Sequence, residues 1–242
     1  MNIHEISLKM PTQMKNLKNA LLLKQLYELK NLGYRYIDLS MLDNTSDEKA
    51  ILPNHLPQLN ALITQCQLCD ISKVRDAVLV GEGSSEADIV FIGFKPSMVD
   101  SSNKSIQSGS KGEMLKKIIT NVLELTPQQV YISNLIKCHP KNDKDIKVNE
   151  IYSCRAYLYK ELEIIKPKIV VTMGIESFNY LTHENVEIEE VRGKSIKHDS
   201  FTIVPLYDLT YILKNPSLKK QLYADLLELK KIIDQTVLKA IS

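Results

Sequence analysis

The sequence predicts an α/β fold with three layers, in which helices cover both faces of a central, mostly parallel sheet of four strands. Two observations lead to this prediction. Short apolar runs with the length of buried strands occur at 88–93, 131–136, 168–173 and 201–206, and segments with helical spacing separate them. The part of the chain before these runs has helical spacing instead, which predicts an N-terminal helical extension.

The N-terminal extension is assigned to residues 1–60 and the α/β domain to residues 61–242. Apolar residues recur at helical spacing within 11–33, and a second helix is expected at about 56–65. About sixty residues of this kind are too few to bury a core of their own. We therefore expect an appendage to the main domain, which can recruit a protein partner.

Two longer helices are expected within the α/β domain. The first, at 148–165, has one apolar face and ends before Pro167. The second runs to Ile233 and is expected to begin with Asn215 as N-cap and Pro216 at the first helical position. Alternation of such helices with the strands is typical of right-handed crossover connections between parallel strands.

Ligands of such folds bind at the carboxyl ends of the parallel strands. The sequence therefore places the loops that follow Gly93, Ile136, Met173 and Leu206 around one common mouth. This mouth is the expected functional site.

Composition sets wide limits on the partners of the protein. The 242 residues include 31 basic and 29 acidic side chains, a formal net charge of +2. This balance neither requires nor excludes a nucleic acid, so any site for a polyanion must come from local clustering. No apolar run approaches the roughly 20 residues of a membrane span, and the first residues lack a compact signal sequence, so a cytoplasmic protein is expected.

Four cysteines form the clearest pattern of metal-ligand type. Cys66 and Cys69 make a C-x2-C pair, Cys138 follows the second strand, and Cys154 lies in the helix after it. Four thiolates can hold zinc or an iron-sulfur cluster, although the spacing fits the paired knuckles of a zinc ribbon poorly. Four unrelated buried cysteines are the alternative, and spacing alone does not choose the metal.

An ordered series of segments resembles one known family. C-x2-C, DIVFIG, YISNLIKC, Cys154, PKIVVTMG, VRGK and YILKNP follow one another between about Leu62 and Ile233. The same series occurs in the family 4, or iron-sulfur, uracil-DNA glycosylases. The resemblance implies DNA that contains uracil or another damaged base as substrate, a monomer, and a structural [4Fe-4S] cluster. Its ligands would be the four cysteines, at positions 66, 69, 138 and 154.

The resemblance also assigns a base-binding pocket. Asn134 stands where the family has the Asn that reads the edge of uracil, and an amide offers both the donor and the acceptor that this edge requires. Gly93 and Pro96 match the Gly-Glu-Ala-Pro-Gly loop, but Phe94 replaces its glutamate and Ser97 its second glycine. An Asn that bonds to the neighbouring loop, and a Phe that only packs, are the alternative interpretations.

Two further positions depart from the family. Gln107 replaces the Phe that stacks on the base, and the Ala-Gly pair that follows aligns with Lys111 and Gly112. Asp208 replaces the catalytic His, so it is either an altered catalytic residue or a loop carboxylate that bonds to backbone. Loss of two acid–base roles can remove several orders of magnitude in rate, which predicts altered or weak activity.

Contacts with DNA are expected from two basic segments and one turn. Lys137 belongs to the first segment, 137–147, and Arg192 to the second, 192–198. Lys214 stands where the family has arginine, and Tyr211 can form part of a wedge between strands. Loops of this kind can hold phosphates, although lysine-rich loops are often only solvated.

Three hypotheses about function remain open at this point. The chain is a divergent DNA glycosylase, or a catalytically inactive iron-sulfur relative that still binds DNA, or an interaction module whose N-terminal helices recruit a partner. The retained Asn134 and cysteines favour the first hypothesis. The replaced His, Glu and Phe favour the second.

Overall fold

A six-stranded sheet forms the centre of the part of the chain that the computed structural model describes, residues 52–141, 144–198 and 200–236. The strand order is β2-β4-β3-β6-β8-β7. The four inner strands are parallel to one another, and the two edge strands are antiparallel to their neighbours. A separate sheet pairs β1 with β5. The strands are β1 (Arg75–Val78), β2 (Glu82–Gly83), β3 (Ile89–Gly93), β4 (Val130–Asn134), β5 (Cys138–Pro140), β6 (Ile169–Met173), β7 (Ile196–His198) and β8 (Phe201–Leu206).

The four predicted strands are confirmed as β3, β4, β6 and β8, and the predicted parallel arrangement is confirmed with them. The predicted number of strands was too low, since the central sheet has six. Both missed strands lie at the edges, and they contain only two and three residues. Segments of this length are too short to show an alternation of apolar and polar side chains.

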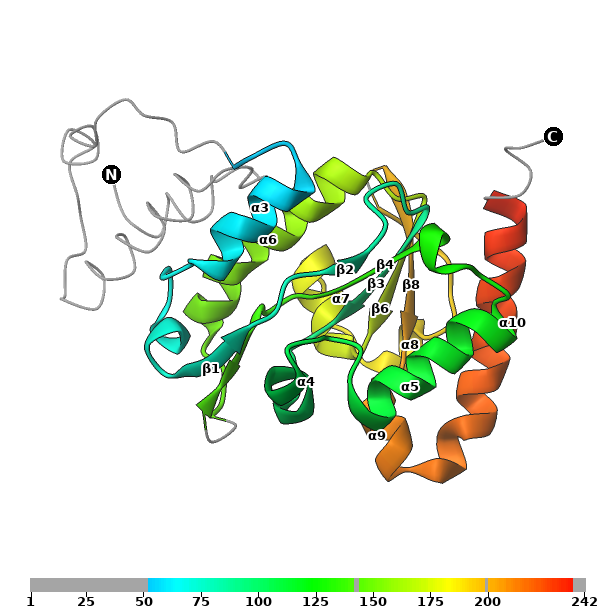
Figure 1. Ribbon diagram of the computed structural model, residues 1–242. Helices are drawn as coiled ribbons and strands as arrows, with labels where there is room; N and C mark the ends of the chain where they lie inside the picture. The colour runs from blue at the N-terminus through cyan, green and yellow to red at the C-terminus, as the bar shows by residue number, and fades with distance from the viewer. Residues whose placement is uncertain (1–51, 142–143, 199, 237–242) are drawn as a thin grey trace, which may run out of the picture.

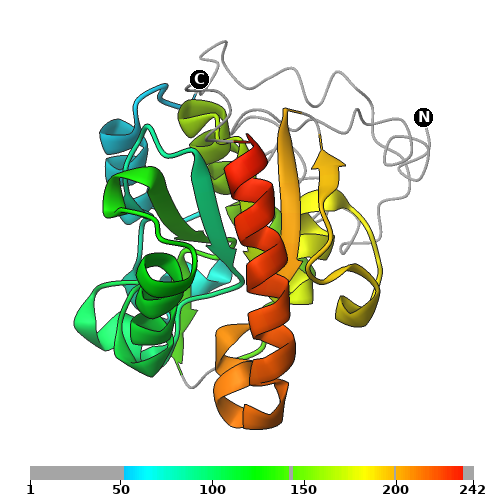
Figure 2. The same ribbon diagram turned by 90° about the vertical axis from the view of Figure 1, so that its right-hand side faces the viewer.

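Successive strand residues point to opposite faces of the sheet, and each face has its own apolar core. Ile89 and Phe91 of β3 belong to the core beneath α5 and α10. Val90 and Ile92 belong to the core beneath α3, α6 and α7. Figure 1 shows α3 beside α6 on one side of the sheet, and Figure 2 shows α10 lying over the other side. The predicted three-layer α/β/α architecture is therefore confirmed.

Helices follow the strands in regular alternation. The predicted helix before Pro167 is α6, and its first turn is closed by Glu150, whose Oε2 accepts the Lys147 N–H at 2.7 Å. A π-helical turn, η3, continues α5. The helices are α3 (Leu56–Thr64), α4 (Met98–Asn103), α5 (Gly109–Lys117), α6 (Val148–Ile165), α7 (Ile175–Thr182), α8 (Ile188–Val191), α9 (Leu209–Lys214) and α10 (Lys219–Thr236), with the short turns η2 (Asp70–Lys73), η3 (Ile118–Val122), η4 (Pro127–Gln129) and η6 (Pro216–Leu218).

The last helical segment begins at the predicted residues. Asn215 is the N-cap and Pro216 the first residue of the 3₁₀ turn η6, which leads into α10, but the Asn215 side chain makes no capping bond there. Its Nδ2 instead donates to the Tyr211 carbonyl at 2.9 Å, at the end of α9. The backbone N–H of Asn215 donates to the same carbonyl at 2.9 Å, so Asn215 closes the end of α9 with both groups.

The predicted boundary at residue 60 falls inside α3. Leu56, Leu59 and Ile63 of this helix are buried in the core that also contains α6, so α3 packs as part of the α/β domain. The predicted helix at 11–33 lies outside the described residues. Among the described helices, none has both the length and the apolar character that crossing a membrane would require.

Candidate functional site

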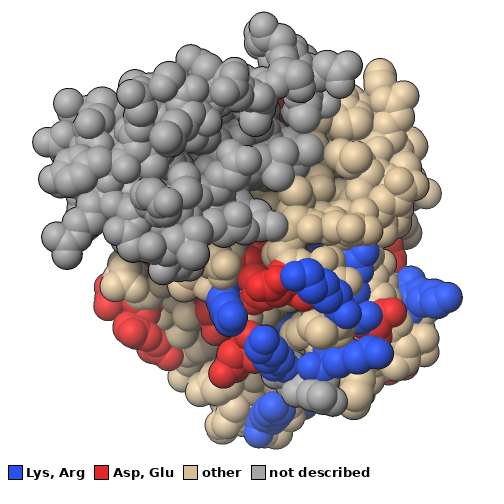
Figure 3. Space-filling model, turned by 90° about the vertical axis from the view of Figure 1, so that its left-hand side faces the viewer, with Lys and Arg blue, Asp and Glu red and all other residues tan. Residues whose placement is uncertain are grey.

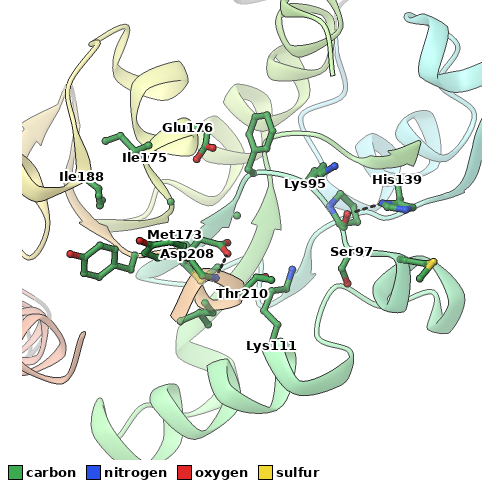
Figure 4. Close-up of a pocket in the computed structure, with 18 of the residues that line it drawn as sticks. Lys95, Ser97, Lys111, His139, Met173, Ile175, Glu176, Ile188, Asp208 and Thr210 are labelled. Carbon is green, nitrogen blue, oxygen red and sulfur yellow. Dashed lines mark hydrogen bonds between the residues drawn. The ribbon is translucent and has the colours of Figure 1, made fainter. Parts of the chain in front are cut away.

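A cleft of about 950 Å³ lies at the carboxyl ends of the parallel strands (Figure 4). The loops after β3, β6 and β8 form its walls, as predicted for a fold of this class. The lining residues are Asp76, Gly93, Phe94, Lys95, Pro96, Ser97, Met98, Lys111, His139, Lys141, Met173, Gly174, Ile175, Glu176, Glu187, Ile188, Glu189, Tyr207, Asp208, Leu209, Thr210 and Tyr211.

Asn134 lies directly beside this cleft, at the end of β4. It pairs in register with the lining residue Gly93 and is only 4% exposed. A Cβ atom added to Gly93 would lie 2.4 Å from Asn134 Oδ1, so a larger residue at 93 would displace the amide. Among the described residues, none hydrogen-bonds to Asn134 Nδ2. Buried amide groups normally have partners, so this donor is available to a ligand.

The loop after β3 is held in place by two polar contacts. Ser97 caps α4, with its Oγ accepting the Asp100 N–H at 3.1 Å. The Pro96 carbonyl lies 3.2 Å from Nδ1 of the buried His139, and because a carbonyl only accepts, this nitrogen carries the proton. Phe94 lines the cleft, and its ring stacks on that of Tyr180 at 6.4 Å. A phenyl ring cannot accept a hydrogen bond from water in the way a carboxylate does.

Gln107 lies outside this cleft in the part of the chain that the structure describes. Its Nε2 donates to Glu82 Oε2 at 3.0 Å. The same carboxylate accepts the Ile106 N–H and the Ser105 hydroxyl. The Gln107 side chain is therefore bound to Glu82 on the edge strand β2. It would have to leave this carboxylate to take the predicted role in the base pocket.

Asp208 begins α9 as its N-cap and lines the cleft. Its Oδ1 accepts the Tyr211 N–H at 3.0 Å, which is the backbone-bonding alternative considered for this residue. Gly174, at φ 98°, separates it from Glu176: a Cβ on Gly174 would lie 3.4 Å from both Asp208 Cβ and Glu176 Oε2. Figure 4 shows the carboxylates of Asp208 and Glu176 on the same side of the cleft. No described residue hydrogen-bonds to the Glu176 side-chain carboxylate.

The charges around the cleft are mixed. Three lysines line it, at positions 95, 111 and 141, against five carboxylates, at 76, 176, 187, 189 and 208. Lys141 lies 3.8 Å from Asp76, and Lys111 lies 3.1 Å from the buried Asp100. The cleft as a whole therefore has no excess of positive charge to attract a polyanion.

The four cysteines come from separate elements that meet beside β5. Cys66 and Cys69 flank the turn before η2, while Cys138 begins β5 and Cys154 lies on α6. The Leu68 N–H points at Cys66 Sγ (3.5 Å). Among the described residues, no group of three or more His, Cys, Asp and Glu side chains is arranged to hold a metal ion.

The thiols nevertheless influence one another. Burial, with smaller contributions from the Cys138 and Cys66 thiols, raises the pKa of Cys69 to about 11. Burial also raises the pKa of Cys138 and of Cys154. Two donors oppose this effect: the Lys137 N–H lies 3.3 Å from Cys154 Sγ, and Arg75 Nη1 lies 3.5 Å from Cys138 Sγ. Without a metal, these groups are protonated thiols at neutral pH.

Lys137 is buried rather than exposed to DNA. It is 1% exposed, and its Nζ lies 2.6 Å from both Glu161 Oε2 and Ser133 Oγ. An ammonium in this position cannot reach a phosphate, which argues against the predicted DNA contact. Sequence spacing gives no signal of this burial, because the partner, Glu161, lies 24 residues away on α6.

The remaining predicted DNA contacts are more accessible. Both Nη1 contacts of Arg192 with the Asp225 carboxylate measure 2.6 Å, and its guanidinium lies 5.4 Å from the centre of the Tyr207 ring. Tyr211 is 50% exposed at the rim of the cleft, and Lys214 is exposed in the last turn of α9. To bind a phosphate, the Arg192 guanidinium must therefore leave the Asp225 carboxylate or contact both groups at once.

The basic segment near β5 is also partly neutralised. Figure 3 shows Lys and Arg side chains gathered with Asp and Glu on the face that β1 and β5 form. Lys73 pairs with Asp70 at 2.9 Å, and Lys141 faces Asp76. Surface pairs of this kind reduce the local field that a polyanion would meet.

The cleft also contains ionisable residues that were not predicted as site residues, among them Lys111, His139 and Glu176. His139 lies within the predicted basic segment 137–147, and Lys111 was matched only to an alanine of the family. Glu176 follows the third predicted strand by three residues, so the rule that sites form at strand ends would have singled it out.

Sequence comparisons show which known proteins this chain is similar to. A family model described as the uracil DNA glycosylase superfamily matches residues 80–228. The type-4 uracil-DNA glycosylase of Saccharolobus solfataricus is 34% identical, covering 71% of this chain and 83% of its own length. That of Sulfurisphaera tokodaii is 32% identical over 73% and 84%. That of Archaeoglobus fulgidus is 28% identical over 67% and 85%.

Proposed function

Because the chain belongs to the uracil DNA glycosylase superfamily, we propose that it binds DNA and hydrolyses the N-glycosidic bond of uracil or another damaged base. The observation that carries this proposal is the buried, unpartnered Asn134 amide beside the cleft. A base that is turned out of the helix must be read along its hydrogen-bonding edge. Asn134 has a free donor for this purpose.

The chemistry of the amide matches uracil. The edge of uracil offers an N–H between two carbonyls, so it needs one acceptor and one donor side by side. Asn134 Oδ1 accepts the N–H, while Nδ2 donates to a carbonyl. Gly93 keeps the space over this amide open, since any larger residue there would collide with Oδ1.

In this proposal, water is positioned by a carboxylate from a different wall of the cleft. Phe94 offers no acceptor, and one oxygen of Asp208 is engaged in the cap of α9. Glu176 is exposed in the cleft on the first turn of α7. A carboxylate there accepts a proton from the water that attacks the sugar carbon, a role that typically contributes ~10²–10⁴-fold in rate.

Activity is expected to be altered or weak compared with the relatives. Base–aromatic stacking is worth ~1–3 kcal/mol, and Gln107 cannot supply it. The Phe94 ring is engaged with Tyr180. Asp208 carries negative charge where the departing base also becomes negative. These features slow the reaction while leaving base recognition by Asn134 in place.

The four cysteines are proposed to hold a [4Fe-4S] cluster. Support comes from the mutual influence of the thiols and from three donors that point at sulfur, the Leu68 and Lys137 N–H groups and the Arg75 guanidinium. Donors of this kind stabilise thiolates and tune cluster potentials. A bound cluster would tie the end of α3, β5 and α6 together and take no part in the reaction. Iron analysis of protein purified without oxygen, against a Cys154→Ser variant that should lose the iron, tests this assignment.

The second candidate function is an inactive DNA-binding relative. It is favoured by the residues at 94, 107 and 208, which depart from the family at three separate motifs. The two candidates differ in turnover and agree in DNA affinity, so only a measurement of base release separates them.

The test is uracil release from single- and double-stranded oligonucleotides, with protein in excess and purified without oxygen. We expect slow release by the parent, and a loss of about 10²–10³-fold in an Asn134→Ala variant, as for removal of one preorganised donor. Asn121→Ala, at an exposed position of η3, is the matched control and should release uracil at the parental rate. DNA binding with no release over hours would contradict the glycosylase proposal and favour the inactive relative.

A further inference from the structure

A lysine reaches into the cleft from the first turn of α5. The Lys111 side chain is 19% exposed, and its Nζ lies 3.1 Å from Asp100 Oδ2. Figure 4 shows it rising toward the middle of the cleft with Thr210 beside it. The same cleft is lined by the carboxylates of Asp208 and Glu176.

The buried Asp100 carboxylate fixes the position of this cation. It is 0% exposed, and its Oδ2 accepts the Ser97 N–H at 2.8 Å and the Ser97 hydroxyl at 2.7 Å. Its Oδ1 accepts the Ser108 N–H at 3.2 Å. The carboxylate therefore joins the loop after β3 to the start of α5, and Lys111 is positioned at this junction.

Lys111 has opposing effects on the stability of the fold. The N-terminus of a helix carries partial positive charge, so a cation in the first turn of α5 is unfavourable by a few tenths of a kcal/mol or more. Lys111 also pairs with the fully buried Asp100 carboxylate, and such a counter-ion stabilises the folded state. The lysine side chain is nevertheless partly exposed and lines the cleft, so its charge can also act on a ligand.

We propose that Lys111 is a catalytic residue that stabilises the negative charge of the departing base. This inference rests on the proposed glycosylase function. When the bond between the sugar C1′ and the base nitrogen breaks, its electron pair stays on the base. A water oxygen then bonds to C1′ and its proton passes to Glu176. The Lys111 ammonium faces the base anion and transfers no proton.

Asp208 cannot supply this stabilisation. The Asp208 carboxylate only accepts hydrogen bonds and would repel an anion. A fixed cation in a partly closed cleft acts more strongly than in bulk water, and removal of one such group typically costs ~10²–10³-fold in rate. Lys111 is therefore expected to affect the bond-breaking step more than DNA affinity.

The experiment compares single-turnover release of uracil and 5-fluorouracil by the parent, Lys111→Met and Lys111→Arg. Fluorine stabilises the base anion, so the better leaving group needs less help. We expect Lys111→Met to lose about 10²-fold on uracil and clearly less on 5-fluorouracil, while Lys111→Arg recovers part of the loss. DNA affinity should change by less than about threefold, and Lys117→Met, at an exposed position of the same helix, should match the parent.

Equal losses on the two bases, or a loss of affinity in place of rate, would overturn the inference and make Lys111 a DNA-positioning residue. A binding measurement tests it independently of turnover. Barbiturate, a pyrimidine ring that is anionic at neutral pH, should bind the parent about tenfold more tightly than Lys111→Met. Neutral uracil should bind both proteins alike.

The results of the release assay and of the barbiturate binding assay together separate the inference from the function on which it rests. Uracil release that does not depend on Lys111, with barbiturate binding unchanged in the variant, refutes the inference alone. Absence of release by the parent, with barbiturate binding that requires Lys111, refutes uracil excision and supports the anion site. Absence of both refutes both.

Discussion

Replacement of the buried Lys137 by methionine should destabilise the protein strongly. Lys137 and Glu161 are 1% and 0% exposed, and the ammonium and carboxylate lie 2.6 Å apart. The variant leaves the carboxylate with only the hydroxyl groups of Ser133, at 2.8 Å, and Tyr131, at 3.3 Å. Removal of one partner from a buried ion pair costs about 3–5 kcal/mol, because the other charge stays buried without compensation.

Urea unfolding measures this loss. With a slope of about 2 kcal/mol per molar urea, the expected shift of the midpoint is roughly 1.5–2.5 M toward lower urea. Tyrosine fluorescence can follow the transition, since the chain has 11 tyrosines and no tryptophan. The double variant Lys137→Met with Glu161→Leu removes both charges, and it should recover most of the lost stability.

Lys160→Met is a matched control on α6, one residue before Glu161. Lys160 is also buried, but both of its partners are exposed: Asn54, whose Oδ1 lies 2.5 Å away, and Glu163, 3.3 Å away with a side chain that is 56% exposed. Water can solvate Glu163 after the change, so the loss should be about 1 kcal/mol. Equal midpoints for Lys137→Met and Lys160→Met, with a salt dependence of DNA binding that falls by about one phosphate contact for the former, would refute the buried placement. Lys137 would then be a surface DNA contact, as the sequence first suggested.

Three further changes test the cleft and its rim. Asp208→His should raise the rate of uracil release by ~10²-fold or more in single-turnover assays, because a positioned His restores a donor where a carboxylate repels the base anion; an unchanged rate would mean that this wall does not face the base. Glu176→Gln should lower the rate by ~10²-fold or more with DNA affinity unchanged, whereas Glu184→Gln, exposed beyond the end of α7, should have no effect; equal rates for the two variants would exclude Glu176 as the group that positions water. Asp225→Asn frees Arg192 from its ion pair, so binding of duplex DNA should tighten at low salt and its logarithmic salt slope should steepen by about 0.9; an unchanged slope would show that Arg192 makes no phosphate contact.

The layers of the fold were predictable because each inner strand is a mainly apolar run. Every residue of 89–93 and of 169–173 is buried, and Thr172 is the single polar side chain in these two strands, so the apolar pattern stays visible. The edge strands β2 and β7 gave no such signal, because their few residues gain stability from pairing and little from burial. The start of the last helical segment was predictable from Asn215 and Pro216, but the sequence did not show that the Asn215 side chain bonds to the end of α9 instead of capping the following turn.

The place of a residue in the structure was predictable where its own strand fixes it. It was not predictable where a contact with a distant element determines it. Asn134 ends a strand, and the strand fixes its place beside Gly93. The direction of the Lys111 side chain depends on Asp100, eleven residues earlier in another helix. The burial of Lys137 depends on Glu161, and a charged residue in a basic segment is ordinarily at the surface. Sequence spacing cannot report such pairings, since they exist only after the sheet has formed.

Although several residues depart from the family pattern, the cleft still contains a cation and a carboxylate, at positions that differ from those of the family. The resemblance pairs Asp208 with a histidine and Lys111 with an alanine, so a donor is lost from one wall while a cation appears on another. It also pairs Phe94 with a glutamate, and Glu176 offers a carboxylate across the cleft. Under the proposed function, Lys111 supplies the positive charge that a leaving anion needs, and Glu176 supplies the acceptor that the attacking water needs. An altered enzyme therefore requires both side chains for base release, whereas an inactive relative that only binds DNA requires neither.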